Sequence, residues 1–226
     1  MYIPVLTIDG PSGVGKGSAS LKVGQQLGWH LLESGALYRA LALMAQEAQV
    51  ALDDEVALTQ LANQLEVTFE AQAHEVRVWL KRAHDETDIT QALRHETYAH
   101  VASQIAVLPQ VRQALLERQR AFRQIPGLVA EGRDMGTVVF PEATVKIFLT
   151  ASVEERAQRR YKQLKEKGIS VKLSTLSQDI AARDQRDSMR PVAPLSTATD
   201  AWVIDTTRLS IEEVVANILK QVSPYT

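Results

Sequence analysis

Apolar and polar residues alternate along this chain with two different periods. A short apolar run at residues 3–8 predicts a buried strand, and an apolar stripe at four-residue spacing over residues 19–27 predicts a helix that Gly28 ends. A second short strand is expected at residues 29–32, followed by a helix over residues 36–49. This order of strand, helix, strand and helix is typical of the start of a parallel α/β sheet.

The pattern changes in the next part of the chain. A predicted helix over residues 54–64 is followed by two segments, at residues 65–69 and 76–80, in which apolar residues alternate with polar ones. This alternation predicts a small antiparallel hairpin, although the connecting turn contains no Gly or Asn. Helices are then expected over residues 91–106 and 109–122.

The last part of the chain returns to the α/β pattern, with one helix opened by a capping box at residues 152–155. The other expected elements are strands at residues 128–130, 145–149 and 201–204 and helices at residues 174–189 and 211–222. We therefore predict a single three-layer α/β/α domain with a five-stranded parallel sheet, a small antiparallel insertion and a helical lid. Its expected parts are a core (residues 1–35, 107–153 and 191–226), an insertion (residues 36–106) and a lid (residues 154–190).

Composition and charge limit the expected domain size, cellular compartment and binding partners. The chain has 226 residues, 45% of them hydrophobic, which is enough for one substantial core. It has no cysteine and a formal net charge of −2, and it begins without an apolar leader, so we expect a cytoplasmic monomer without nucleic-acid or membrane partners. A metal site built from histidines is not expected, because no metal-binding spacing occurs among His30, His74, His84, His95 and His100.

The clearest chemical signal is a glycine-rich segment directly after the first strand. Residues 10–18 match the pattern G-x-x-x-x-G-K-S/T, in which backbone N–H groups surround phosphate oxygens and the next helix directs its positive end at them. Lys16 would supply a charge for the outer phosphates of ATP, and the Ser18 hydroxyl would hold Mg²⁺. The predicted nucleotide-binding residues are Gly10, Pro11, Ser12, Gly13, Val14, Gly15, Lys16, Gly17 and Ser18.

Charged residues recur at helical spacing in the two predicted lid helices. One set falls at i, i+3 and i+4, and the other at i, i+4 and i+7, so each set shares one helix face. Such arginines could close over transferring phosphates and exclude water, although solvated helices with surface salt bridges would show the same spacing. The residues are Arg156, Arg159 and Arg160 in the first helix and Arg183, Asp187 and Arg190 in the second.

Two further arginines favour a kinase over other phosphate-loop proteins. Arg39 and Arg133 each lie just beyond the carboxyl end of a predicted strand, where guanidinium groups can bind a second phosphate. A GTPase should show an Asn-Lys-x-Asp motif, which is absent. Residues 201–205 superficially match the magnesium-binding strand of ATPases, but we expect them to form the sheet edge. Among phosphate-loop proteins, the small-molecule kinases are therefore the class that the sequence favours.

Four segments of the chain resemble those of the bacterial cytidylate kinase family. Residues 10–18 are similar to its GPSGxGKG(S/T) loop, residues 34–39 to its SGAxYR segment, residues 131–137 to its (D/E)GRDMGT motif, and residues 183–195 to its RDxxDxxRxxAPL stretch. The resemblance extends over essentially the whole chain. The enlarged monophosphate-binding insertion of the bacterial branch also fits.

The resemblance implies transfer of a phosphoryl group from ATP, with Mg²⁺, to CMP or dCMP. A kinase for another small acceptor, such as UMP, AMP or a non-nucleotide, and a nucleotide-gated binding module are the alternatives. The predicted catalytic residues are Lys16, Arg133, Asp134, Arg156, Arg159 and Arg160, with Asp134 serving in positioning rather than as a general base. The predicted acceptor-binding residues are Ser34, Tyr38, Arg39, Ser103, Arg112, Arg133, Asp134, Arg183, Asp187 and Arg190.

Overall fold

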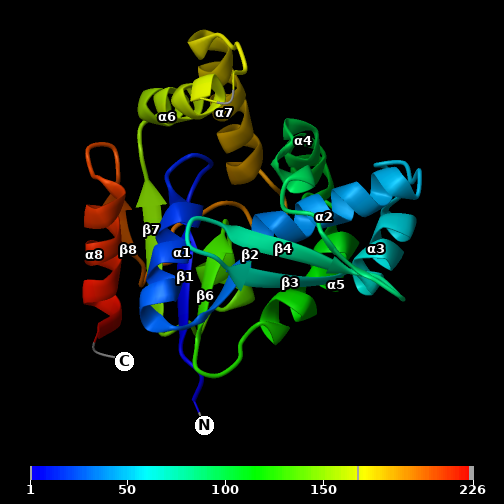
Figure 1. Cartoon of the computed structure of the whole chain (residues 1–226), viewed down its shortest axis with the longest axis horizontal. Coiled ribbons are helices and arrows are strands. Elements are labelled where there is room, and N and C mark those ends of the chain that lie inside the picture. The colour runs from blue at the N-terminus through cyan, green and yellow to red at the C-terminus, as the bar shows by residue number, and fades with distance from the viewer. Residues whose placement is uncertain (1, 167, 224–226) are drawn as a thin grey trace. The chain divides into compact units, whose positions relative to one another are not determined.

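A computed structural model describes residues 2–166 and 168–223 of the chain (Figure 1). Its strands are β1 (Val5–Asp9), β2 (His30–Glu33), β3 (Glu66–Ala71), β4 (Val76–Lys81), β5 (Glu86–Asp88), β6 (Leu128–Gly132), β7 (Val145–Thr150) and β8 (Trp202–Asp205). The larger sheet has five strands in the order β2-β6-β1-β7-β8, and the smaller has three in the order β3-β4-β5. The predicted α/β class, with its five-stranded parallel sheet and small antiparallel insertion, is confirmed.

The helices follow the sequence pattern closely. They are α1 (Lys16–Leu27), α2 (Ser34–Glu47), α3 (Glu55–Gln64), α4 (Glu96–Ile105), α5 (Pro109–Ala121), α6 (Val153–Glu166), α7 (Leu173–Ser188) and α8 (Ile211–Val222), with a 3₁₀ turn η1 (Ala92–Arg94) and a π-helical turn η2 (Met135–Val139). Within the described residues, none of these helices is long and apolar enough to cross a membrane.

Helix ends are set by local chemistry. Gly28 adopts a φ of +66° directly after α1, and the Trp29 amide bonds back to the Gly24 carbonyl at 3.1 Å, so the predicted glycine stop is confirmed. At the start of α6, the Glu155 amide donates to the Ser152 hydroxyl at 3.2 Å, which confirms one half of the predicted capping box. The other half is wrong, because the Ser152 amide donates to the Thr207 hydroxyl and the Glu155 carboxylate accepts from Arg159. A complete reciprocal capping box, which we did not predict, opens α8.

Backbone proximity divides the chain into two compact units. Unit 1 comprises Met1–Val5 and Ser20–Glu131, and unit 2 comprises Leu6–Ala19 and Gly132–Thr226. Within unit 1, α2 packs against α3 and α4, and α3 packs against α5. Within unit 2, β1 pairs in parallel with β7 and β7 with β8, while α6 packs against α7. The division into core, insertion and lid stays a prediction.

The insertion in unit 1 departs from expectation at two points. The predicted hairpin of β3 and β4 is confirmed, but β5 adds a third strand that carries no apolar residue and so left no period-two signal. The helix predicted over residues 91–106 is confirmed for α4 (Glu96–Ile105), but its first part is wrong. His95 has an extended backbone, with φ −66° and ψ 134°, which separates η1 from α4 and allows Leu93 to be buried by a tight turn.

Candidate functional site

The phosphate loop, residues 10–18, is held in a shape that only glycine permits at its first position. Gly10 has a φ of +147°, and a Cβ atom there would lie 2.1 Å from the Leu149 carbonyl oxygen. The Lys16 ammonium lies across the loop, donating to the carbonyl oxygens of Gly10 at 2.9 Å and Pro11 at 2.7 Å. The positive charge of Lys16 is therefore held against carbonyl oxygens of the loop itself.

A buried carboxyl group ends β1 directly before this loop. The two oxygens of Asp9 accept hydrogen bonds from the amides of Met135 (2.9 Å) and Gly136 (2.7 Å). Burial raises the pKa of Asp9 to about 6, with these amides and Lys16 opposing the rise and Asp134 adding to it. Asp9 thus joins the loop to the segment after β6, a link that sequence reasoning missed because Asp9 looked like the end of an apolar strand.

The segment after β8 anchors the loop from its other side. Thr206 is only 1% exposed, and its hydroxyl donates to the Val14 carbonyl oxygen at 3.1 Å. Arg159 donates to the same hydroxyl at 3.2 Å, while Arg160 donates to the side chain of Gln163 at 3.3 Å. The structure therefore links Arg159, predicted as catalytic, to an anchor of the loop.

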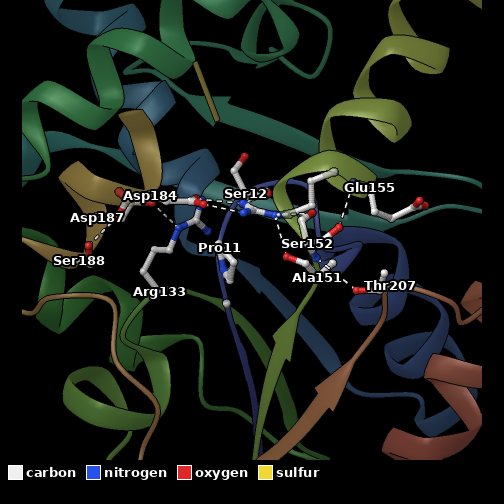
Figure 2. Close-up of polar contacts among 12 residues, drawn as sticks. Pro11, Ser12, Arg133, Ala151, Ser152, Glu155, Asp184, Asp187, Ser188 and Thr207 are labelled. Carbon is white, nitrogen blue, oxygen red and sulfur yellow. Dashed lines mark hydrogen bonds and ion pairs between the residues drawn. The ribbon is translucent and has the colours of Figure 1, made fainter. Parts of the chain in front are cut away.

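Arg156 has an extensive set of partners within unit 2. Its Nε donates to the carbonyl oxygens of Ala151 (3.1 Å) and Ser152 (3.3 Å), and its Nη1 donates to the Ser12 carbonyl oxygen at 3.1 Å. Its two terminal nitrogens also form a bidentate pair with Asp184, at 3.0 and 2.6 Å. Figure 2 shows the Asp184 and Ser12 side of this network, in which α7 is joined to the phosphate loop.

A second arginine and carboxylate cluster forms around Asp187 on α7. Arg133 donates from Nε to the Asp187 carboxylate at 2.7 Å (Figure 2). Burial opposes ionisation of Asp187, but Arg133, together with Arg183 and Arg190, outweighs it and holds the pKa of Asp187 below its ordinary value. The structure thus brings together four of the predicted acceptor-binding residues within unit 2.

Other predicted acceptor-binding residues lie in unit 1. Ser34 is the first residue of α2 and is buried, and the Arg112 guanidinium lies 6.0 Å from the centre of the Tyr38 ring. Arg112 also donates to the Ala106 carbonyl oxygen at 3.2 Å. The Ser103 hydroxyl is buried and, among the residues that the structure describes, has no hydrogen-bond partner.

Two carboxyl groups stand side by side at the ends of β2 and β6 in unit 1. Glu33 and Glu131 are register partners in the parallel pair, so their side chains leave the sheet on the same face. Burial raises the pKa of Glu33 to about 8, and Glu131 adds to the rise, while Arg39 and Arg94 oppose it. The predicted phosphate ligand Arg39 therefore acts electrostatically on a carboxyl pair that the sequence motifs did not single out.

Sequence reasoning also missed Asp184. It lies inside the quoted RDxxDxxR stretch, three residues before Asp187, so the i, i+3 spacing was the available signal. No group of three or more His, Asp or Glu side chains is placed to hold a metal ion in the part of the chain that the structure describes.

A glycine-rich phosphate loop on a parallel sheet, with an arginine cluster in the same unit, defines a phosphate-loop protein of the small-molecule kinase class. A family model described as cytidylate kinase matches residues 6–224. Curated cytidylate kinases of Aeromonas salmonicida (strain A449), Sodalis glossinidius (strain morsitans) and Stutzerimonas stutzeri (strain A1501) are 55%, 56% and 54% identical to this chain. The matches cover 96%, 96% and 98% of this chain and 92%, 93% and 96% of those proteins. The chain belongs to the cytidylate kinase family.

Proposed function

We propose that this chain transfers the γ-phosphoryl group of ATP to CMP or dCMP, giving ADP and CDP or dCDP. Family membership over nearly the whole chain supports the reaction. The structural observation that carries the proposal is the cluster of Arg133, Arg183, Asp187 and Arg190 in the same compact unit as the phosphate loop. Binding of a triphosphate alone needs no second set of arginines, whereas a phosphate acceptor does.

The phosphate loop forms the donor half of the proposed site. Its N–H groups and the N-terminus of α1 would bind the ATP phosphates, and Lys16 would exchange its two carbonyl partners for phosphate oxygens. The exposed Ser18 hydroxyl in the first turn of α1 is a hard oxygen donor of the kind that Mg²⁺ prefers, so the residues present fit this ion. Bound Mg²⁺ would neutralise charge on the β- and γ-phosphates.

The acceptor half is assigned by position in the family motifs. Cytosine presents an amine donor beside two acceptors, so its recognition needs both an acceptor and donors, which the Ser103 hydroxyl and the Arg112 guanidinium can supply. Arg39, Arg133 and Arg183 would bind the acceptor phosphate, and Asp187 would bind a sugar hydroxyl. The remaining proposed contacts are Arg190 at the base and Ser34, Tyr38 and Asp134 around it.

Transfer itself requires positioning and charge compensation. An oxygen of the acceptor phosphate forms a bond to the γ-phosphorus as the bond to the bridging oxygen of ADP breaks in line with it. The attacking oxygen is already ionised, so Asp134 need not act as a general base. Lys16, Arg133, Arg159 and Arg160 would compensate the charge that spreads over the transferred group. Action as a monomer, without nucleic acid or membrane, stays a prediction.

A coupled assay of ADP release tests the proposal. The purified chain would be supplied with ATP, Mg²⁺ and either CMP, dCMP, UMP or AMP, and we expect the highest kcat/KM with CMP or dCMP. Faster turnover with UMP or AMP would favour a kinase for another acceptor. ATP binding without transfer to any of the four would favour a nucleotide-gated binding module.

A further inference from the structure

The contacts of Arg156 connect the phosphate loop to α7 through a single side chain. Its Nη1 donates both to the Ser12 carbonyl oxygen in the loop, at 3.1 Å, and to Asp184 Oδ1 on α7, at 3.0 Å. Its Nη2 donates to Asp184 Oδ2 at 2.6 Å, and its Nε is bound to carbonyl oxygens at the start of α6. Arg156 can therefore shift only if the loop or α7 moves with it.

This guanidinium is poorly placed to bind a substrate phosphate. Arg156 is 3% exposed, and its hydrogen bonds engage all three of its guanidinium nitrogens. Its aliphatic carbons also lie against the loop, because a Cβ built at Gly13 would come within 3.3 Å of the Arg156 Cβ. The bidentate carboxylate neutralises a cation that would otherwise be buried without a counter-charge. These contacts favour positioning over direct phosphate binding for Arg156.

The same face of α7 reaches the acceptor-side cluster. Asp184 and Asp187 are three residues apart, so they share one side of the helix, and each is paired with an arginine from a different segment. Asp184 binds Arg156, which contacts the phosphate loop, and Asp187 binds Arg133, which follows β6 (Figure 2). One helix thus carries both the link to the donor loop and a proposed acceptor contact.

We propose that Asp184 is a positioning residue that couples donor binding to acceptor binding, acting through Arg156 on the Ser12 carbonyl. The inference rests on the proposed function for the identity of the two ligands. A donor that orders the phosphate loop would fix Arg156, which would fix Asp184 and the face of α7 that carries Asp187. Because coupling between two ligands is reciprocal, CMP would strengthen donor binding by the same factor.

Calorimetric titration of CMP, with and without the non-hydrolysable donor β,γ-imido-ATP and Mg²⁺, measures this coupling directly. For the unmodified chain we expect the donor analogue to lower the Kd of CMP about fivefold or more, within the usual range for coupled sites. In Asp184→Asn, which keeps the shape of the side chain but removes its charge, we expect the factor to fall below about twofold. Asp184→Glu should restore part of it.

Asp179→Asn is the matched control, because Asp179 is an exposed carboxylate on the same helix. It removes the same charge from α7 and should leave the coupling factor unchanged. Equal coupling in Asp184→Asn and the unmodified chain would overturn the inference while leaving the proposed function intact. No coupling in the unmodified chain would overturn it too. Failure of CMP to bind under any condition would overturn both.

A second measurement covers the case in which Asp184→Asn does not fold. Hydrogen exchange of the unmodified chain, with β,γ-imido-ATP and Mg²⁺ but no CMP, should show slower exchange of the amides of α7 (Leu173–Ser188). The reporter is independent of the acceptor's identity. If donor binding protects the phosphate loop but leaves exchange in α7 unchanged, the inference is wrong.

Discussion

The carboxyl groups at the ends of β1 and β2 have opposite surroundings. Each strand ends in a carboxyl group next to residues proposed to bind phosphate, fully buried at Asp9 and partly buried at Glu33. Asp9, at the end of β1, has Phe148 as its register partner on β7 and receives two backbone amides. Glu33, at the end of β2, has a second carboxyl group, Glu131, as its register partner. Burial raises the pKa of both, to about 6 for Asp9 and about 8 for Glu33.

The difference shows how the surroundings decide whether a buried carboxyl group is charged. Burial raises the pKa of Asp9 to about 6, and two backbone N–H groups limit this rise, so most Asp9 side chains are ionised at neutral pH. At Glu33 a like charge adds to the effect of burial, and Arg39 and Arg94 compensate only in part. At neutral pH the carboxyl group at the end of β1 is therefore mostly ionised, whereas the one at the end of β2 is mostly protonated and its pKa depends on nearby cations.

Removal of the lysine at the β1 end should have the largest effect. Lys16→Ala leaves the loop without its mobile cation, and we expect kcat to fall by about 100-fold or more, as for other groups that stabilise transition-state charge. Steady-state ADP release measures it. Lys220→Ala, an exposed lysine on α8, should behave like the unmodified chain. A change of less than about twofold for Lys16→Ala would exclude this loop as the donor site.

Substitution of the β1 carboxylate should mainly cost stability. Asp9→Asn places an amide NH₂ group against one of two backbone N–H donors, so a buried donor loses its partner. We expect the free energy of unfolding to fall by about 1–3 kcal/mol in urea titrations at neutral pH. Asp53→Asn, at an exposed position, should change it by less than about 0.5 kcal/mol. Equal stability of the two variants would contradict the role given to Asp9.

At the β2 end, Arg39→Ala should affect the acceptor. Loss of one charge-assisted phosphate contact should raise the KM for CMP about tenfold, equivalent to about 1.4 kcal/mol, with little change in the KM for ATP. It should also raise the pKa of Glu33 further, because it removes an opposing cation. Initial rates at varied CMP and varied ATP separate the two constants. An equal rise in both would argue against an acceptor role.

The last prediction concerns the stability effect of Glu33 itself, which depends on pH. Its pKa is about 8 in the folded chain against an ordinary 4.5, so the folded state binds more protons between these values. The free energy of unfolding should therefore fall as pH rises through this window. Glu33→Gln should make the free energy of unfolding less dependent on pH in this window. The control Glu154→Gln, at an exposed position on α6, should leave the pH dependence unchanged. If the free energy of unfolding of Glu33→Gln and of the unmodified chain changed in parallel from about pH 5 to pH 9, the raised pKa of Glu33 would be refuted.

The features predicted correctly from the sequence are those with local causes. The phosphate loop requires glycines at fixed offsets, and Gly28 and Ser152 act on residues within one helical turn of themselves. The alternating pattern of β3 and β4 arises because one face of each strand is packed while the other is solvated, and that asymmetry is written in the sequence.

The features that were missed depend on distant partners. Asp9 binds amides 126 and 127 residues away, and Arg156 finds Asp184 28 residues further along the chain. The pairing of Glu33 with Glu131 follows from strand order, which no local pattern encodes. In each case the sequence shows the residue type, but its partner is determined by the tertiary fold.

The hydrogen bond from Thr206 to Val14 has a consequence for how the protein is made. It joins residues that are 192 positions apart, so the loop that is synthesised among the first residues receives this anchor only after β8 has been translated. Protein synthesis proceeds from the N-terminus at about 5–20 residues per second, so Thr206 is added roughly ten seconds or more after the loop. A ribosome-bound fragment ending before residue 206 should therefore carry the whole nucleotide-binding motif and still bind ATP more weakly than the released chain.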